Sequence, residues 1–372
     1  MSPSASRLRV RGDLHFLNAV SLEARPGHVH PREAEAPTYW DYIKVESLLS
    51  LQNGFAADER ALTDDEVLFI VVHQIDELWF KLALRELTAA RDLLVGPVAN
   101  ERAPARIAAS LRRAILLVRY ATQHFELIET LTTRAFLDFR DKLAPASGYQ
   151  SAQFRELEIL LGLQDADRIA CGTDGSYMCA FRGPDGAEVP AARRVQSRLR
   201  DQPTLEAAFT RWLFWTPIDA STPAAPDDAA AVSAFVDSYL GALAGDLRRD
   251  AAAFLSADDV DPAERAHVGR ARAALLFVEC YAEGASAAWA REVVDAVSGF
   301  EQAFVIFRQR HARTVERIIG RRPGTGGSIG VEYLDETAVR YRFFRDVATA
   351  RTFLLRSTQA PRSARPLVTA GQ

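Results

Sequence analysis

Apolar residues recur every three or four positions along most of this 372-residue chain, which is the spacing of one face of an α-helix. The clearest example is segment 64–94, which runs without glycine or proline until Gly96 and Pro97. Thr63 precedes this segment and Glu66 follows three residues later, as in a capping box at a helix start. The pattern therefore predicts a long helix that begins after Thr63.

The same spacing predicts further helices, separated by proline, glycine and short polar stretches. Thr38 is the predicted cap of the first of them. We find no internal repeat and no run of alternating polar and apolar residues typical of strands, so the predicted fold class is all-α. The other predicted helices cover residues 38–49, 104–131, 132–143, 150–161, 203–215, 231–254, 262–317 and 335–355.

The composition along the chain predicts a single helical domain over residues 37–357. Residues 1–36 are rich in Ser, Arg, Pro and Glu and are predicted to be a mobile arm, and residues 358–372 a polar tail. Segment 163–200 contains a glycine-rich and proline-containing stretch and is interpreted as an excursion or small hairpin. Segment 217–231 is predicted to be a linker or surface loop.

Charge, cysteine content and hydropathy argue against a nucleic-acid-binding, a disulfide-rich secreted or a membrane-spanning protein. The chain has 45 basic and 49 acidic residues, and without a basic excess nucleic acid is not expected as the main partner. Cys171, Cys179 and Cys280 cannot form a disulfide framework and indicate a reducing compartment. The first 20 residues lack the apolar core of a signal peptide, and no apolar run is long enough to span a bilayer. We therefore expect a cytoplasmic protein without a membrane partner.

His73 lies inside the apolar stretch VLFIVVHQ, one helical turn after Phe69. Residues four apart share a face of a helix. Two interpretations follow from this spacing. His73 is either a core histidine with its hydrogen bonds satisfied, or an imidazole that faces an apolar ligand pocket with Phe69 as its wall.

His311 lies on the apolar stripe of another predicted helix, with Phe307 four residues before it and Val315 four residues after it. A lone imidazole in this position could donate to a backbone carbonyl. It could also bind an iron atom axially, because apolar neighbours would keep water from the metal. The chain has no C-x-x-C-H motif, so a haem would be bound non-covalently.

Arg140 lies in AFLDFRDKL, with Phe136 one turn before it. Its guanidinium could pair with Asp138 or Asp141, or it could bind the carboxylate of a ligand through two parallel hydrogen bonds.

The segment GTGGSIG, residues 324–330, is rich in glycine. It has neither the G-x-G-x-x-G spacing nor the lysine of a nucleotide-binding loop. It could close over a small ligand, or it could simply end the preceding helix.

Four segments of the chain, in order, resemble the tryptophan 2,3-dioxygenase family. They are TYWDYIKVESLLSLQ, DDEVLFIVVHQIDELWFKLALREL, FRDKLAPASGYQSAQFRELEILLG and FRQRHARTVERIIGRRPGTGGSIGVEYL. The resemblance implies a helical haem protein, usually a homotetramer. It also implies an enzyme that uses haem b and O2 to cleave the indole C2–C3 bond of L-tryptophan, giving N-formylkynurenine.

The resemblance also implies roles for individual residues. His311 corresponds to the proximal haem ligand, His73 to the distal histidine that hydrogen-bonds the indole N–H, and Arg140 to the arginine that pairs with the substrate carboxylate. The other implied substrate positions are Phe69, Phe136, Leu143, Thr325 and, lent by a neighbouring subunit, Tyr39, Tyr42 and Ile43. The implied positions on the haem side are Phe125, Ser147 and Gly324.

Several residues depart from the family pattern. Phe136 replaces a tyrosine near the substrate carboxylate, Phe125 replaces a tryptophan against the haem, and Asp76 lies one turn from His73. Ser328 and Ile329 replace a Ser-Ser pair. These departures leave open a haem monooxygenase that inserts one oxygen atom into tryptophan or a substituted tryptophan. A haem-binding sensor or carrier would leave Arg140 without a ligand to hold.

Overall fold

The computed structural model describes residues 38–96, 103–143, 148–169, 177–183, 187–281, 288–324 and 330–360. In these ranges the regular structure is helical, and extended backbone pairs only at two isolated bridges. The predicted all-α fold class is confirmed. The chain divides into two compact units, Met1–Leu51 and Gln52–Gln372, which are described separately below.

The described part of the first unit contains two short helices, α1 (Tyr39–Tyr42) and α2 (Val45–Leu48). The hydroxyl of Thr38 accepts the backbone N–H of Asp41 at 3.1 Å, which confirms the predicted cap. The prediction of one continuous helix over residues 38–49 is wrong. Lys44 has a φ of 58°, in the left-handed region, and this conformation interrupts a right-handed helix.

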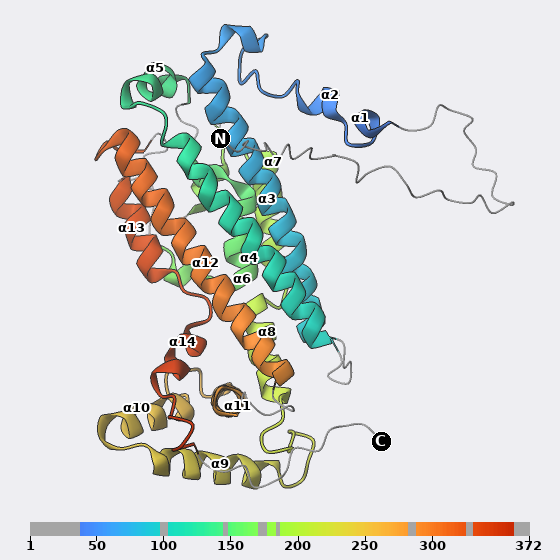
Figure 1. The fold of residues 1–372 in the computed structure, drawn as a ribbon, viewed down its shortest axis with the longest axis vertical. Coiled ribbons are helices and arrows are strands. Elements are labelled where there is room, and N and C mark those ends of the chain that lie inside the picture. Colours follow the sequence, from blue (N-terminus) through green and yellow to red (C-terminus); the bar gives the residue numbers. More distant parts are fainter. Residues whose placement is uncertain are drawn as a thin grey trace, which may run out of the picture. The chain divides into compact units, whose positions relative to one another are not determined.

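Three long helices of the second unit run side by side: α3 (Asp64–Val95), α4 (Ala103–Ile128) and α12 (Ala288–Ile319) (Figure 1). The hydroxyl of Thr63 accepts the N–H of Glu66 at 3.2 Å, so α3 begins where the capping pattern predicts. The three helices bury their apolar stripes against one another, and this forms the main hydrophobic core.

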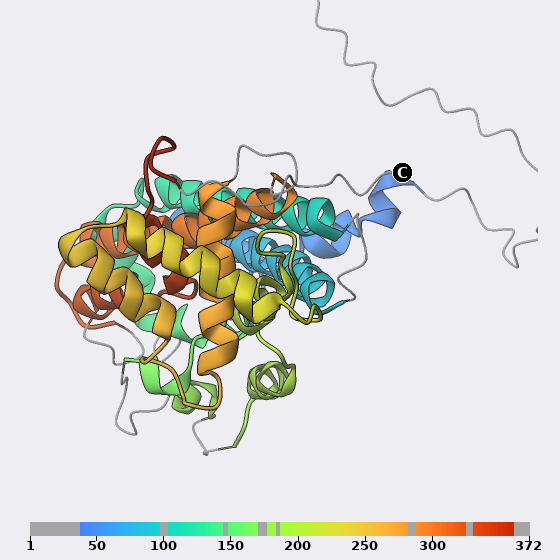
Figure 2. The same cartoon turned by 90° about the horizontal axis from the view of Figure 1, so that it is seen from below.

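Shorter helices surround this core. Helices α6, α8 and α5 pack against α3, α13 packs along α12, and α9, α10 and α11 lie together at the end opposite α5 (Figures 1 and 2). Their bounds are α5 (Thr133–Leu143), α6 (Ala152–Leu161), α7 (Pro190–Arg200), α8 (Leu205–Trp215), α9 (Asp228–Ala242), α10 (Gly245–Ser256), α11 (Arg265–Cys280), α13 (Val331–Arg340) and α14 (Arg345–Thr352), with 3₁₀ turns at Glu59–Ala61, Gly148–Gln150, Asp165–Asp167 and Tyr177–Phe181.

The predicted helix over residues 335–355 is interrupted and forms α13 and α14. Between the two helices, the backbone N–H groups of Phe343 and Phe344 donate to the carboxylate of Glu301 on α12, at 3.1 and 3.2 Å. Both phenylalanine rings are buried. The break therefore results from contacts with a distant residue, which helical periodicity cannot predict.

Two other predicted helices are also interrupted. Segment 231–254 breaks before Gly245, which has a φ of 58°, a conformation that glycine adopts without strain. The predicted helix over residues 262–317 consists of α11 and α12, and residues 282–287 between them lie outside the described ranges.

Segment 163–200 contains more regular structure than an excursion or hairpin. Its last part is helix α7, with Pro190 at the helix start, where proline is favoured. In the described part of this segment, extended backbone pairs at one bridge, between Arg182 and Glu188, while residues 170–176 and 184–186 lie outside the described ranges.

Segment 217–231, predicted to be a surface loop, is partly buried. Ile218 and Ser221 are 0% and 2% exposed. Arg270 of α11 holds the segment by donating to the carbonyl of Ser221 at 3.3 Å and to the carboxylate of Asp228 at 2.8 Å. The predicted arm, residues 1–36, lies outside the described ranges, and the domain boundaries stay predictions.

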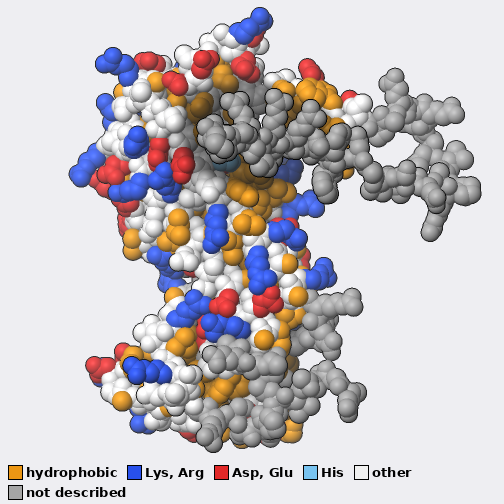
Figure 3. All heavy atoms as spheres, in the orientation of Figure 1, with side chains coloured by type: hydrophobic (Ala, Val, Ile, Leu, Met, Phe, Trp, Pro, Cys, Tyr) orange, Lys and Arg blue, Asp and Glu red, His pale blue; other side chains and the backbone are white. Residues whose placement is uncertain are grey.

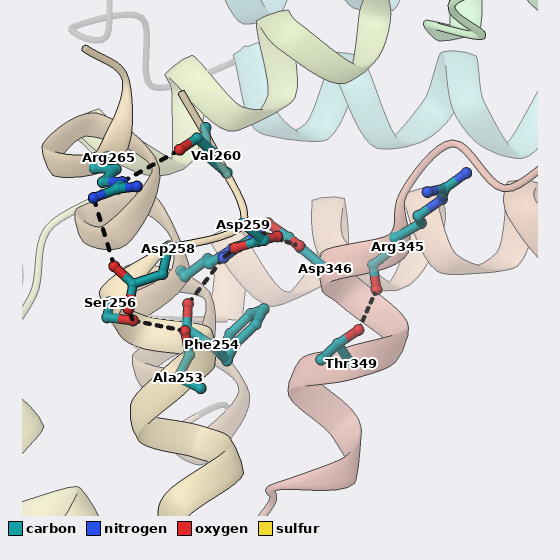
Figure 4. A network of polar contacts seen from close by, with 11 residues as sticks. Ala253, Phe254, Ser256, Asp258, Asp259, Val260, Arg265, Arg345, Asp346 and Thr349 are labelled. Atoms are coloured by element: carbon teal, nitrogen blue, oxygen red, sulfur yellow. Dashed lines mark hydrogen bonds and ion pairs between the residues drawn. The ribbon is translucent and has the colours of Figure 1, made fainter. Parts of the chain in front are cut away.

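Arg272 of α11 bonds to α10, to the loop that follows α10 and to α14. Its guanidinium donates to the carbonyl of Phe254 at 3.0 Å and forms ion pairs with Asp259 at 2.7 Å and Asp346 at 2.8 Å. Figure 4 shows Asp259 and Asp346 close together, one from the loop after α10 and the other from α14. The ion pair between Arg272 and Asp346 fixes the position of α14, which follows the break at Phe343 and Phe344.

The surface carries side chains of both charges. On the face shown in Figure 3, Lys and Arg are interspersed with Asp and Glu, in agreement with the lack of a basic excess in the sequence. None of the helices in the described ranges is both long and apolar enough to cross a bilayer.

Cys179 and Cys280 are free thiols, as predicted, and Cys171 lies outside the described residues. Burial raises the pKa of the Cys280 thiol to about 11, so this cysteine stays protonated and unreactive at neutral pH.

Candidate active site

A cavity of about 300 Å³ lies inside the second unit, with walls formed by α3, α4, α5, α6, α12 and α13. The residues that line it come from segments more than 200 positions apart in the sequence. Seven of the residues predicted from the sequence meet there: Phe69, His73, Phe125, Phe136, Arg140, His311 and Gly324.

The remaining predicted residues do not line the cavity in the described part of the chain. Leu143 is the last residue of α5 and is not in the wall, so a direct substrate contact is not supported by this structure. Thr325 and Ser147 lie outside the described residues. Three further predicted residues belong to the first unit and are 75%, 82% and 42% exposed: Tyr39, Tyr42 and Ile43.

His73 presents one ring nitrogen to the cavity. Its Nδ1 atom lies 2.7 Å from the carbonyl oxygen of Phe69, so Nδ1 carries the hydrogen and donates it. Burial lowers the pKa of His73, although this backbone hydrogen bond and the nearby Glu77 oppose the shift. A neutral imidazole with its hydrogen on Nδ1 leaves Nε2 as a hydrogen-bond acceptor. Nδ1 of His73 thus has its hydrogen bond satisfied, as in the first interpretation, and His73 lines the cavity, as in the second.

His311 is a half-buried, neutral imidazole in the α12 wall. Its pKa is lowered to about 4, chiefly by burial and to a smaller extent by the charges of His73, Arg308 and Arg155. Its ring stacks on Phe125 at a centroid distance of 5.4 Å, with 10° between the planes. No hydrogen bond from His311 to a backbone carbonyl is present among the described residues. A neutral imidazole in apolar surroundings is a suitable axial ligand for iron.

Arg140 reaches from α5 to the glycine-rich segment. Its Nη2 atom donates to the carbonyl of Pro323 at 2.5 Å, directly before Gly324. Ion pairs with Asp138 or Asp141 are absent from the described contacts, so the first interpretation of Arg140 is not supported. Its remaining N–H groups are placed to bind an anionic group of a ligand in the cavity.

Aromatic rings form the wall around His73. The Phe69 ring lies 4.0 Å from the His73 ring and 5.8 Å from the Phe136 ring, measured between centroids. Phe136 and Phe139 pack edge to face at 5.3 Å. This arrangement suits a flat aromatic ligand, which gains from offset and edge contacts as well as from burial.

A buried cluster of charges that the sequence patterns did not predict lies at the cavity wall formed by α6 and α12. Glu158 is completely buried and pairs with Arg308 at 2.6 Å, Arg168 at 2.7 Å and Arg155 at 2.9 Å. Burial alone would raise the pKa of Glu158, but the three guanidiniums lower it to about 2. Arg308 lies three residues before His311 on an otherwise apolar stripe, and this position was the available sequence signal.

This cluster leaves positive charge uncompensated at the cavity. Arg155 and Arg308 both line the cavity and share one carboxylate, and the Nε atom of each is buried with no hydrogen-bond partner in the described residues. Buried cations without a full set of partners are costly, so the wall favours an anionic ligand group.

The described residues thus form an all-helical fold in which a neutral histidine, aromatic rings and arginine side chains surround one cavity. A comparison with known proteins identifies the family to which this chain belongs. The family model described as tryptophan 2,3-dioxygenase matches residues 23–354, and the chain belongs to this family. The predicted family and the predicted enzyme class, an oxidoreductase, are confirmed.

Named relatives agree with this family. The chain is 47% identical to "Tryptophan 2,3-dioxygenase" of Sorangium cellulosum (strain So ce56), with 91% of this chain and 88% of the relative covered. It is also 47% identical to "Tryptophan 2,3-dioxygenase 2" of Ralstonia nicotianae, with 87% and 95% covered. A "Tryptophan 2,3-dioxygenase-like protein" of Xanthomonas campestris is 44% identical, over 62% of this chain and 94% of the relative.

Proposed function

We propose that this protein is a haem-dependent dioxygenase that cleaves the indole C2–C3 bond of L-tryptophan. One molecule of O2 reacts with one molecule of tryptophan, and both oxygen atoms enter the product, N-formylkynurenine. The observation that carries the proposal is the meeting of His73, Arg140 and His311 at one cavity. The tryptophan dioxygenase function predicted from the sequence also agrees with the family of the chain.

The residues of the cavity fit haem b. His311 would ligate the iron through its neutral imidazole, and Phe125 would pack beside that ring. Arg155 and Arg308 offer uncompensated positive charge, which suits the two anionic propionates of haem b. When bound, haem supplies the binding and activation of O2.

The protein's own residues bind and orient the substrate. We assign the carboxylate to Arg140, whose guanidinium can form two parallel hydrogen bonds with it. The indole ring packs against Phe69 and Phe136, and its N–H donates to Nε2 of His73. We also assign Thr325 to the amino-acid end of the substrate, and Gly324 to the haem side of the cavity. When the carboxylate and the indole ring are held at the same time, the substrate has a fixed orientation toward O2, and this lowers the entropic cost of the reaction.

We assign His73 an orienting role and not that of a general base. Oxygen addition at C3 of an indole does not require prior removal of the N–H proton. The tautomer inferred from the Nδ1 contact agrees with this role, because Nε2 can accept one hydrogen bond while Nδ1 donates to the carbonyl of Phe69.

A monooxygenase reaction is the second candidate. Phe136 offers no hydroxyl at the wall near Arg140, and Asp76 adds an acidic group to the cavity. Insertion of one oxygen atom consumes two electrons and two protons and releases water, so this reaction requires an external reductant. Dioxygenation requires none, and turnover without a continuous supply of reductant favours it.

We further propose a cytoplasmic homotetramer in which α1 of one subunit reaches the cavity of a neighbour. The support for this assembly is the exposure of Tyr39, Tyr42 and Ile43, three large side chains that a monomer leaves in water. Light scattering of the haem-loaded protein should give the mass of four chains. A monomer with full activity would contradict the shared site.

The direct test of the proposed function uses protein loaded with haem b, reduced once and then freed of reductant. With L-tryptophan and air, we expect N-formylkynurenine to accumulate over many turnovers, identified by mass and by its ultraviolet absorbance. An enzyme that stops after one turnover unless reductant is added would contradict dioxygenation and favour the second candidate.

A further inference from the structure

Asp76 is an acidic residue of the cavity wall that takes no part in the proposed binding of haem or substrate. It lies on α3, three residues after His73, so the two residues are neighbours on the helix surface. Asp76 is 9% exposed and lines the cavity. Its Oδ1 atom lies 2.7 Å from Nδ1 of His124 on α4.

His124 connects Asp76 with the solvent. The side chain of His124 is 21% exposed, whereas that of Asp76 is 12% exposed. The next residue, Phe125, lines the cavity, but His124 itself does not. One hydrogen bond therefore joins a carboxyl group in the cavity wall to an imidazole that water can reach. This is the arrangement of a short proton path.

The neighbouring carboxylate, Glu77, is held differently although it also lines the cavity. Its Oε1 atom accepts from the hydroxyl of Ser151 at 2.5 Å, and its Oε2 atom accepts from the amide of Gln153 at 2.7 Å. Both oxygens of Glu77 thus accept hydrogen bonds from neutral donors, which carry no ionisable proton. Asp76 is the acidic wall residue with an ionisable partner.

Burial raises the pKa of Asp76 to about 6, while the hydrogen bond from His124 lowers it and the charge of Glu77 raises it. The carboxyl group can therefore change its protonation state near neutral pH. The other ionisable groups that line the cavity are His73 on α3, Arg140 on α5, Tyr149 in the turn before α6, Arg155 on α6, Arg308 and His311 on α12, and Tyr333 on α13.

We infer that Asp76 is the proton-exchange group of the cavity, and that it takes up a proton from solvent through His124 when the substrate binds. Seating an apolar indole ring in the cavity removes water from the carboxylate, and desolvation favours the neutral acid. Water gives a proton to the exposed ring nitrogen of His124, and the Nδ1 proton of His124 passes to Oδ1 of Asp76. The inference rests on the proposed function, since tryptophan is the ligand.

The number of protons taken up on binding follows from the difference between the pKa of Asp76 in the free protein and in the complex. A carboxyl group with a pKa of about 6 is mostly ionised at pH 7, and a higher pKa in the complex requires net proton uptake on binding. We expect uptake of about half a proton or more at pH 7. Uptake should shrink toward pH 5, where Asp76 is already protonated in the free protein.

The test is calorimetric titration of L-tryptophan into the ferric, haem-loaded protein without reductant, so that no turnover occurs. Titrations at pH 7 in phosphate and in Tris give the protons taken up, because the two buffers release very different heats on deprotonation. The wild type should show uptake and Asp76→Asn should show none. Asp92→Asn is the matched control, because Asp92 lies on the same helix but is 63% exposed and pairs with Arg91.

Equal uptake by the wild type and Asp76→Asn, or no uptake by the wild type, would overturn the inference. His124→Gln tests the path: with a pH-indicator dye in a stopped-flow instrument, proton uptake should lag behind binding by at least tenfold relative to the wild type. Uptake at the wild-type rate would exclude the route through His124.

Failure of the substrate assignment would look different, because tryptophan would then not bind at all. A monooxygenase would still bind tryptophan, and the number of oxygen atoms in its product would reveal it. The inference can still be tested in the ligand-free protein by infrared spectroscopy. A protonated-carboxyl band should titrate near pH 6 in the wild type and disappear in Asp76→Asn. Absence of that band in the wild type would overturn the assignment of Asp76 independently of any substrate.

Discussion

The Nδ1 atom of His73 lies 2.7 Å from the carbonyl oxygen of Phe69, one turn earlier on α3. This hydrogen bond fixes the imidazole tautomer and directs Nε2 into the cavity. Phe69 therefore contributes in two ways, with its ring as the wall and its carbonyl as the partner that orients His73.

The first prediction concerns His73→Ala. If His73 accepts only one hydrogen bond from the indole N–H, the loss should be about 0.5–1.5 kcal/mol, or up to about tenfold in kcat/KM. An obligatory general base would instead cost about 10²–10⁴-fold. The measurement is kcat/KM for tryptophan and for 1-methyltryptophan. A loss beyond a thousandfold, together with no turnover of the methylated substrate by the wild type, would mean that His73 transfers protons.

The second prediction concerns Arg140→Ala. Truncating one member of a buried charge pair typically costs 2–5 kcal/mol, so L-tryptophan should bind about one to three decades more weakly. Binding of 3-methylindole, which lacks the amino-acid end, should change little, and this ligand serves as the internal control. Similar losses for both ligands would show that Arg140 supports the structure through its bond to Pro323 and does not hold the carboxylate.

The third prediction concerns His311→Gly. Removal of the imidazole should remove most of the bound haem, seen as loss of the Soret band after purification, because the protein–iron bond is lost. Free imidazole should enter the space and restore haem binding. His124→Gly, at a histidine outside the cavity wall, should keep the haem without imidazole. An unchanged spectrum in His311→Gly would show that another residue ligates the iron.

The fourth prediction concerns the stability of the Glu158 cluster. Glu158→Gln should lower the free energy of unfolding at pH 7 by about 3–5 kcal/mol, because three guanidiniums lose their shared carboxylate. The pKa of Glu158 is lowered from 4.5 to about 2, so its contribution is complete above about pH 4.5 and is lost as the pH falls toward 2.

Urea unfolding of the haem-loaded protein at several pH values measures this contribution. The difference between wild type and Glu158→Gln should shrink as the pH falls from 4.5 toward 2. Glu86→Gln is the control, because the Glu86–Arg113 pair is partly exposed and should contribute about 0–1 kcal/mol. A difference that does not depend on pH would mean that the loss comes from packing and not from charge.

Local patterns predicted the helix starts better than the helix breaks. Thr63 and Glu66 form the expected cap because both partners lie within four residues of each other. The break at Phe343 and Phe344 depends on Glu301, some 40 residues earlier, and no local pattern contains that contact. Periodicity assigns a residue to a face, but it does not show which distant side chain receives the freed N–H groups.

In the candidate site, too, local spacing was predictable from the sequence and long-range pairing was not. Phe69 and His73 were paired by their spacing, and the structure brings them to the same wall. The charged wall was missed because Glu158 and Arg308 lie on different helices, 150 positions apart in the sequence. Their pairing depends on the packing of α6 beside α12, which requires the tertiary fold.

The central claim is that both atoms of O2 enter one molecule of tryptophan in this cavity. The most direct measurement is the mass of the product formed from L-tryptophan under ¹⁸O2 in ordinary water, taken early enough to limit exchange of the formyl oxygen. The account predicts N-formylkynurenine that carries two ¹⁸O atoms. A hydroxylated or 2-oxindole product with one ¹⁸O atom, formed only with added reductant, would contradict it.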